Sequence, residues 1–327
     1  MTARLRDDPD ALSVLIDRAA EHFGIRAAYI EKDFWVTEVL RVAARTRLIR
    51  LPDGNTADTT FVFKGGTSLS RVFELIRRFS EDIDLLAVFP DEASISAWHK
   101  VLKQVDTEVS SHLGVLGEVP PGGSTTGIKR YTTYRYPAEG VDVDIKEVVL
   151  LELGSRGGSH PAEVHSYRSL LSTFAFAELG ENGGVWDEFV PFDVNVLAPE
   201  RTLLEKLAAV HDAASRMDTV ALKKGGRHFY DIYCLLANAE VRDALDVLGC
   251  DGVSALVDDI NKHSDEAGFG CTARPKGGFA DSPAFDSAHS SREAITAGYA
   301  AARGLIYGER IAFESVDGIV AEYRGLL

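Results

Sequence analysis

Apolar residues recur every three or four positions in two stretches near the start of the chain, which is the spacing of amphipathic helices. Residues 8–23 open with Asp8 and Pro9, a capping side chain followed by a proline that suits a first helical turn. The apolar face of this helix consists of Leu12, Leu15, Ile16, Ala19 and Phe23. Residues 28–44 repeat the pattern and lead into several arginines. Cations are common near helix C-termini because they interact favourably with the helix dipole, and we favour this interpretation. The alternative is that these arginines contact nucleic-acid phosphates. These arginines are Arg41, Arg45, Arg47 and Arg50.

Runs of consecutive apolar or β-branched residues predict buried strands in the middle of the chain. They cover residues 61–63, 82–89, 131–136 and 148–153. Between the second and third runs, we predict a helix over residues 92–112 and an irregular loop over residues 119–127, which are rich in glycine and proline.

From residue 199 onward the pattern becomes helical. Residues 199–213 begin with a proline and place Leu203, Leu207 and Val210 on one stripe. Further helices are predicted at residues 227–236, 292–305 and 313–324. Strands followed by helices predict an α+β fold, divided into residues 1–198 and a helical domain of residues 199–327. Residues 269–286 are rich in glycine and proline and form either a lid or a surface loop.

The composition is that of a globular protein with a sizeable core. The 327 residues suffice for one large or two ordinary domains, with 45% hydrophobic and 26% charged residues. Neither a membrane-length apolar run nor the apolar core of a signal peptide is present, so we expect a cytoplasmic protein without a membrane partner. The three cysteines lack Cys-x-x-Cys spacing, which disfavours disulfides and zinc. The net charge of −15 disfavours a broadly basic nucleic-acid groove but allows a local patch.

Residues 61–89 combine a strand, a glycine turn, a helix and a second strand. Gly65 and Gly66 allow a phosphate group to approach the backbone, and a helix starting near Thr67 would offer free amides to anionic oxygens. A glycine pair alone is more often only a turn. Here it gains significance because two acidic residues follow on the next strand.

Asp82 and Asp84 alternate with Ile83, so both carboxylates should project from one face of the second strand. Neighbouring carboxylates repel each other, and a divalent cation normally relieves this repulsion. Mg²⁺ binds one or two carboxylates together with phosphate oxygens and water. The alternative is a solvated acidic strand end, but the pair and the glycine turn together predict a site for a nucleoside triphosphate and Mg²⁺.

Glu152 interrupts the apolar run of residues 148–153 and is our candidate for a third metal-binding acid. A lone carboxylate in a central strand must be paired or hold a metal ion. The alternative third acid is one of Asp142 and Asp144, which follow a proline and a glycine as in an exposed loop.

Lys206 and Asp231 lie among apolar neighbours on two of the predicted helices. A half-buried aspartate requires a cationic partner, which Lys206 or Arg227 could supply. A purely structural lysine–aspartate contact between packed helices and a catalytic role are both open, and His228 is interpreted as a helix-packing residue.

The chain resembles the AbiEii/AbiGii nucleotidyltransferase toxins, relatives of DNA polymerase β that form the toxin halves of abortive-infection toxin–antitoxin pairs. The mycobacterial MenT toxins look similar. The segments that carry the resemblance are Glu31-Lys-Asp-Phe-Trp-Val36, Phe63-Lys-Gly-Gly-Thr-Ser-Leu69, Arg78-Phe-Ser-Glu-Asp-Ile-Asp-Leu85, Leu151-Glu-Leu-Gly-Ser-Arg156, Glu200-Arg-Thr-Leu-Leu-Glu-Lys-Leu207, Arg227-His-Phe-Tyr-Asp-Ile-Tyr233 and Leu305-Ile-Tyr-Gly-Glu309.

The resemblance implies a polymerase β-like core with a mixed sheet and a helical C-terminal domain that completes the active site. It implies that Asp82 and Asp84 bind Mg²⁺, with Glu152 as the third acid. The triphosphate would be held by Lys64, Gly65, Gly66, Thr67, Ser68 and Ser80. Lys206 and Asp231 match the remaining site positions of the family.

The resemblance further implies a toxin of an antiviral toxin–antitoxin system, with a cognate antitoxin as its partner. The donor is a nucleoside triphosphate and the acceptor is RNA, with the 3′ end of tRNA as the specific candidate. Two alternatives are transfer to a hydroxyl of a protein or small molecule, and a nucleotide-binding interaction module without turnover.

Overall fold

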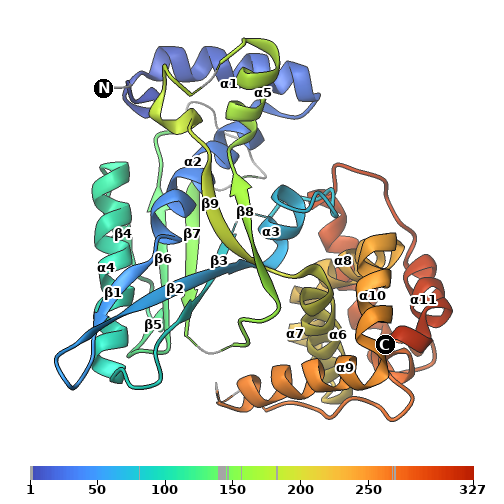
Figure 1. Cartoon of the computed structure of the whole chain (residues 1–327). Helices are drawn as coiled ribbons and strands as arrows, with labels where there is room; N and C mark the ends of the chain where they lie inside the picture. Colours follow the sequence, from blue (N-terminus) through green and yellow to red (C-terminus); the bar gives the residue numbers. More distant parts are fainter. Residues whose placement is uncertain are drawn as a thin grey trace. The chain divides into compact units, whose positions relative to one another are not determined.

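The computed structural model describes residues 3–80, 82–138, 145, 147–155, 157–181, 183–266, 268 and 270–327 of the chain. The chain forms two compact units, and each is made of three segments. Unit 1 consists of Met1–Lys64, Glu81–Ser155 and Glu163–Val196, and unit 2 of Gly65–Ser80, Arg156–Ala162 and Leu197–Leu327. Figure 1 labels the helices and strands of both units. The polypeptide therefore leaves unit 1 at the glycine turn and returns to it just before Asp82.

A mixed sheet forms the centre of unit 1, which confirms the predicted α+β fold. In the described residues its main order is β4-β6-β7-β3-β2-β9-β8, with β1 paired to β2 and β5 paired to β6. β3 runs parallel to β7 and β2 runs parallel to β9, whereas β2–β3 and β6–β7 are antiparallel. The strands are β1 (Arg47–Arg50), β2 (Thr56–Lys64), β3 (Asp82–Val88), β4 (Gly117–Glu118), β5 (Ser124–Thr125), β6 (Lys129–Arg135), β7 (Val148–Gly154), β8 (Ala162–Tyr167) and β9 (Phe192–Leu197).

The loop predicted at residues 119–127 is partly ordered as a strand. Ser124 and Thr125 form β5, which pairs with the start of β6, because the chain turns back on itself and the Ile128 amide donates to the Thr125 carbonyl at 3.0 Å. Gly127 lies in this hairpin turn, whereas residues 119–123, with Gly122 and Gly123, lie outside regular structure as predicted.

Helices α2 (Ala27–Ala43) and α4 (Ile95–Leu113) cover one face of this sheet, where they contact β3, β7 and β6 (Figure 1). Asp106 of α4 marks that face, since it accepts hydrogen bonds from the hydroxyls of Thr132 at 2.8 Å and Tyr134 at 3.0 Å. Thr132 is the register partner of Leu151, so Leu151 also points toward the helices. Side chains one residue away along these strands, including Glu152, project from the opposite face.

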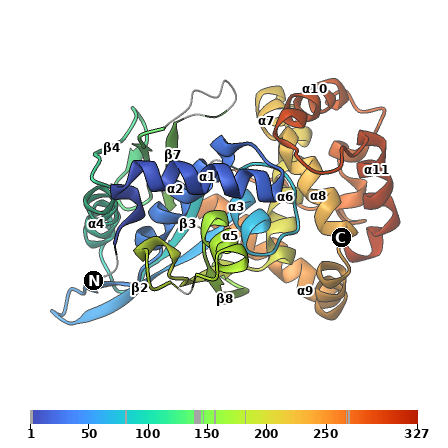
Figure 2. The same cartoon turned by 90° about the horizontal axis from the view of Figure 1, so that it is seen from above.

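The N-terminal helices of unit 1 pack against each other and against a later helix, α5 (Leu170–Glu178). α1 (Pro9–Phe23) lies beside α5, as both Figure 1 and Figure 2 show. The two N-terminal helices predicted from the sequence are thus confirmed.

α2 buries charged side chains as well as apolar ones. Asp33 accepts a hydrogen bond from the Leu170 amide at 2.5 Å, and Glu38 binds Arg41 and His112 at 2.9 and 2.8 Å. Although burial alone would raise it, His112 and Arg41 hold the pKa of Glu38 below its ordinary value.

Two of the arginines at and beyond the end of α2, Arg41 and Arg47, have internal partners. Arg41 donates to the carbonyls of Glu188 and Val190 at 2.8 and 2.6 Å, and Arg47 donates to the Val42 carbonyl and to Glu108, both at 2.8 Å. These contacts favour the structural interpretation of Arg41 and Arg47 over phosphate binding.

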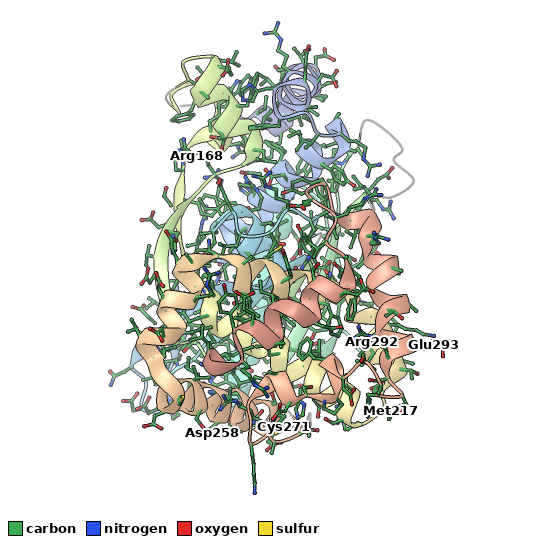
Figure 3. The ribbon with its side chains drawn as sticks, turned by 90° about the vertical axis from the view of Figure 1, so that its right-hand side faces the viewer. Arg168, Met217, Asp258, Cys271, Arg292 and Glu293 are labelled. Atoms are coloured by element: carbon green, nitrogen blue, oxygen red, sulfur yellow. The ribbon has the colours of Figure 1, made fainter. Side chains whose placement is uncertain are left out.

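Unit 2 is helical and has its own apolar core, which includes Leu203, Leu207, Phe229 and Ile295. α8 and α10 pack closely because Gly226 meets Gly298, where neither backbone leaves room for a side chain. At the start of α10, Arg292, labelled in Figure 3, pairs with Asp317 of α11 at 3.0 Å. The helices are α3 (Gly65–Arg71), α6 (Pro199–Ser215), α7 (Thr219–Lys224), α8 (Gly226–Ala237), α9 (Ala239–Glu266), α10 (Arg292–Ala302) and α11 (Phe313–Glu322).

The described part of residues 269–286 is fixed to the rest of unit 2. His211 of α6 contacts the Ala273 carbonyl at 3.0 Å, Thr272 donates to Asp212 at 2.8 Å, and Phe279 is buried in the core. Of the two sequence-based alternatives, the contacts favour a packed surface segment over a lid. Among the described residues, none of the helices has both the length and the apolar character that spanning a bilayer requires.

Candidate active site

Four polar residues form a row across the face of the unit 1 sheet that lies opposite α2 and α4. Asp84 of β3 has Lys64 of β2 as its register partner on one side and Glu152 of β7 on the other. Glu152 is in turn opposite Tyr131 of β6. All four side chains are partly buried, and directly opposed residues have Cβ atoms about 5 Å apart. The sheet thus brings together two of the predicted acids and the predicted phosphate-binding lysine.

Asp82 lies on the same face, two residues before Asp84 and next to Leu150 in the register. In the described residues, no group of three or more histidine, cysteine, aspartate or glutamate side chains has an arrangement ready to hold a metal ion. The set still suits Mg²⁺ chemically, since this ion takes only one or two carboxylates and completes its shell with phosphate oxygens and water. Asp142 and Asp144, the alternative third acids, lie outside the described residues.

Tyr131 is a neighbour of the carboxylates that the sequence did not single out. Burial raises the pKa of its phenol, and the negative charges of Glu152 and Asp84 raise it further. The phenol therefore stays protonated at neutral pH and can donate a hydrogen bond. The sequence signal was the run of aromatic and β-branched residues in Tyr131-Thr-Thr-Tyr134, but only the strand register shows which tyrosine lies opposite Glu152.

The glycine turn lies in unit 2, at the start of α3. Gly65 has a φ of 83°, a backbone conformation that favours glycine, and α3 begins there rather than near Thr67. Thr67 and Ser68 are buried, and the Ser68 hydroxyl donates to the Gly65 carbonyl at 3.0 Å. The Ser68 hydroxyl therefore helps to shape the turn.

Gly66 lies directly against Arg78 and Ser80. A methyl carbon at Gly66 would be 2.5 Å from Nη2 of Arg78 and 2.9 Å from Oγ of Ser80. The second glycine is thus required by the close approach of a guanidinium, independently of any ligand.

Arg78, Asp231 and Lys206 form a buried ionic cluster beneath this turn. Asp231 has no exposed surface and Arg78 is only 1% exposed. Arg78 donates from Nε and Nη2 to the two carboxylate oxygens of Asp231 at 2.6 and 2.7 Å, and Lys206 Nζ lies 2.8 Å from Oδ2. Of the two cations that the sequence offered as partners of Asp231, Lys206 makes the contact. The expectation that Asp231 would be half-buried was wrong, since its side chain is fully buried.

The charges of this cluster support one another. Burial alone would raise the pKa of Asp231 and lower that of Arg78, but their mutual attraction reverses both shifts. The pKa of Lys206 is lowered because burial outweighs the attraction of Asp231. Two cations and one anion leave the cluster with an excess of positive charge, which favours a neighbouring anion.

His228 also touches the cluster, so its interpretation as packing alone was incomplete. Its Nδ1 lies 3.5 Å from Lys206 Nζ. Burial and the nearby Lys206 lower the pKa of His228 to about 3, which keeps the imidazole neutral at physiological pH.

The segment that carries Arg78 is held by contacts with residues 305–307. The Phe79 amide donates to the Leu305 carbonyl at 2.9 Å, the Tyr307 amide donates to the Arg77 carbonyl at 3.1 Å, and the rings of Phe79 and Tyr307 are 4.9 Å apart. The weakest of the sequence motifs, residues 305–309, thus supports the Arg-Phe-Ser segment. Sequence reasoning missed Arg78 itself, although it stands first in that motif.

A model of the nucleotidyl transferase AbiEii toxin family, a type IV toxin–antitoxin system, matches residues 53–317. The match covers most of the chain and includes both the carboxylate row and the ionic cluster. The chain belongs to the AbiEii family. It is accordingly a nucleotidyltransferase toxin, which uses a nucleoside triphosphate and has an antitoxin partner. No curated protein matches the chain.

Proposed function

We propose that this AbiEii-family protein transfers a nucleotide from a nucleoside triphosphate to RNA, with Mg²⁺ bound by Asp82, Asp84 and Glu152. The observation that carries the metal site is the direct pairing of Asp84 with Glu152 on adjacent parallel strands, with Asp82 on the same face. Carboxylates placed opposite each other on adjacent strands repel, and a shared cation relieves that repulsion. The proposed RNA acceptor, specifically the 3′ end of tRNA, rests on the family resemblance of the motifs.

The protein's own residues divide the work of such a transfer. When bound, Mg²⁺ would stabilise the developing charge on the attacking and leaving oxygens of the reaction. A carboxylate of the row accepts the proton of the acceptor hydroxyl. The protonated phenol of Tyr131 donates a hydrogen bond to an oxygen on the same face, and Lys64 places a positive charge beside Asp84.

In unit 2, the excess positive charge of Arg78 and Lys206 over Asp231 suits the triphosphate. Asp231 has a positioning role, because its two oxygens fix the guanidinium and the ammonium at 2.6 to 2.8 Å. Gly66 allows Arg78 to lie immediately under the turn, so the turn and its cation form one rigid element.

The test is incubation of the purified protein with each of four labelled nucleoside triphosphates and Mg²⁺, together with total RNA, purified tRNA or total protein. We expect label in tRNA, and its loss on removing Mg²⁺ with a chelator. Asp84→Asn and Glu152→Gln should reduce labelling by at least about 100-fold, consistent with the size of effects of this kind. The matched control is Asp187→Asn, a carboxylate of unit 1 outside the sheet.

Label found only in protein would overturn the RNA acceptor and favour transfer to a protein hydroxyl. Labelling that persists in full after chelation would overturn the metal site. Expression without the antitoxin provides the cellular readout: growth should stop with the native chain and continue with Asp82→Ala.

A further inference from the structure

A hollow of about 210 Å³ within unit 2 is lined by residues of α6, α7 and α8 and by Gly225, which lies between α7 and α8. Small side chains leave this space open: Ala209 and Ala213 line it from α6, and Ala221 lines it from α7. An apolar cavity of about 150 Å³ holds a benzene ring. The hollow is therefore large enough for one small organic group.

The polar part of its wall is basic. Lys224, Arg227 and His228 line the hollow beside the apolar residues. The positive charge of Arg227 contributes to the lowered pKa of both Lys206 and His228, which shows that cations concentrate in this region. A basic hollow is unusual in a chain whose net charge is −15, and it selects for an anionic ligand.

His228 lines the hollow, and its neutral ring carries one hydrogen-bond donor. Lys206 has only donor hydrogens, so Nδ1 of His228, at 3.5 Å from Lys206 Nζ, acts as the acceptor. The proton of the neutral imidazole is then on Nε2. His228 thus lines the hollow and also contacts Lys206, a member of the Lys206–Asp231–Arg78 cluster.

We propose that this hollow binds the phosphate and sugar of one nucleotide, with Lys224, Arg227 and His228 as donors to the phosphate. The apolar wall of alanines, with Val210 and Leu222, receives the organic part. The site lies within unit 2 and shares no residue with the carboxylate row of unit 1, so it does not depend on the proposed Mg²⁺ site. The ligand is either a free mononucleotide or one nucleotide unit of an RNA chain.

To test this, the full chain is labelled with ¹³C-histidine, and its histidine ring signals are recorded by NMR as uridine 5′-monophosphate is added. We expect the His228 ring signal to shift with saturation. Uridine, which lacks the phosphate, should bind at least about tenfold more weakly, because charge-assisted hydrogen bonds contribute more than 1.4 kcal/mol. Equal affinity for uridine and its monophosphate would overturn the phosphate assignment.

Two variants localise the binding. Ala221→Phe fills the hollow from an exposed position, and Lys224→Glu reverses an exposed charge on its rim. Each variant should either abolish the His228 shift or weaken the affinity for uridine 5′-monophosphate by about tenfold or more. Ala301→Phe, on an exposed position of α10, is the matched control and should bind normally.

Asp84→Asn separates this site from the proposed catalytic one. Binding retained in Asp84→Asn and lost in Ala221→Phe supports the hollow. Binding lost in Asp84→Asn and retained in Ala221→Phe would place the nucleotide at the carboxylates and overturn the inference. A short 5′-phosphorylated RNA oligonucleotide distinguishes the two ligand sources. Tighter binding than the mononucleotide indicates an RNA unit, and equal or weaker binding indicates the free mononucleotide. If neither ligand shifts the His228 signal, the proposed site is overturned.

Discussion

The guanidinium of Arg78 binds both carboxylate oxygens of Asp231, with Nε 2.6 Å from Oδ1 and Nη2 2.7 Å from Oδ2. Both side chains are almost completely removed from solvent. The planar guanidinium matches the carboxylate in a way that a lysine ammonium cannot. Because this guanidinium also lies against Gly66, the ion pair fixes the glycine turn from below.

Removing Arg78 should therefore destabilise the protein strongly. Arg78→Met leaves Asp231 with Lys206 as its remaining ionic partner in the cluster, and losing half of a buried pair costs about 3–5 kcal/mol. Urea denaturation measures the change. The control is Arg324→Met, which removes an exposed pair with Asp281 and should cost about 0–1 kcal/mol. Equal losses for the two variants would contradict the structural role of the Arg78–Asp231 pair.

Gly66→Ala should strongly reduce nucleotide transfer, although it adds only one methyl group. The added methyl carbon would lie 2.5 Å from Arg78 Nη2, so the guanidinium must move away from the turn. We expect a loss of activity of about tenfold or more together with lower stability. Gly318→Ala, a helical position with nothing near the added carbon, should instead be neutral or stabilising by up to about 1 kcal/mol. Normal activity in Gly66→Ala would show that the close approach is dispensable.

Glu152→Gln should separate activity from stability. The substitution removes one of two like charges paired across adjacent strands and keeps the shape of the side chain. Labelling of RNA should fall by about 100-fold while the free energy of unfolding stays within about 1 kcal/mol of the native value. A large loss of stability would mean that Glu152 is a structural residue of the sheet.

His228 should make stability depend on pH. Its pKa in the folded chain is lowered to about 3, mainly by burial and next by Lys206, from an ordinary value of 6.5. Between these two values the unfolded chain binds a proton that the folded chain does not, so stability falls as the pH falls through this window.

The expected slope from this single group is at most about 1.4 kcal/mol per pH unit. Urea denaturation of the native chain and His228→Gln at several pH values from 3 to 6.5 should show the native chain losing more stability toward low pH. His263→Gln, on α9 of the same unit, controls for the loss of a histidine. Parallel curves for the native chain and His228→Gln would exclude this linkage.

The sequence predicted the elements that carry the chemistry because their patterns are local. The alternation around Ile83 predicted a strand with both aspartates on one face, and β3 (Asp82–Val88) has that arrangement. The lone Glu152 in an apolar run predicted a central strand, and β7 lies between β6 and β3. Whether these acids hold a metal remains a prediction.

What the sequence did not predict depends on contacts between distant residues. Arg78 and Asp231 are far apart along the chain, and nothing near Arg78 indicates a buried partner. Tyr131 could be assigned to the site only from the β6–β7 register, because a shift of one residue would place its side chain on the other face of the sheet. α9 (Ala239–Glu266) was not predicted; it contains a backbone break at Gly249, whose φ is 64°.

The segment containing the glycine turn cannot reach its native position early in synthesis. A ribosome releases the chain from the N-terminus, and segments pack as soon as their partners exist. Arg78 obtains its carboxylate only when Asp231 has been made, and Phe79 obtains its main-chain partner only with Leu305. A growing chain therefore lacks the finished turn until synthesis has passed Leu305. For a toxin, this order of events delays activity inside the cell until all the segments that hold the turn have been produced.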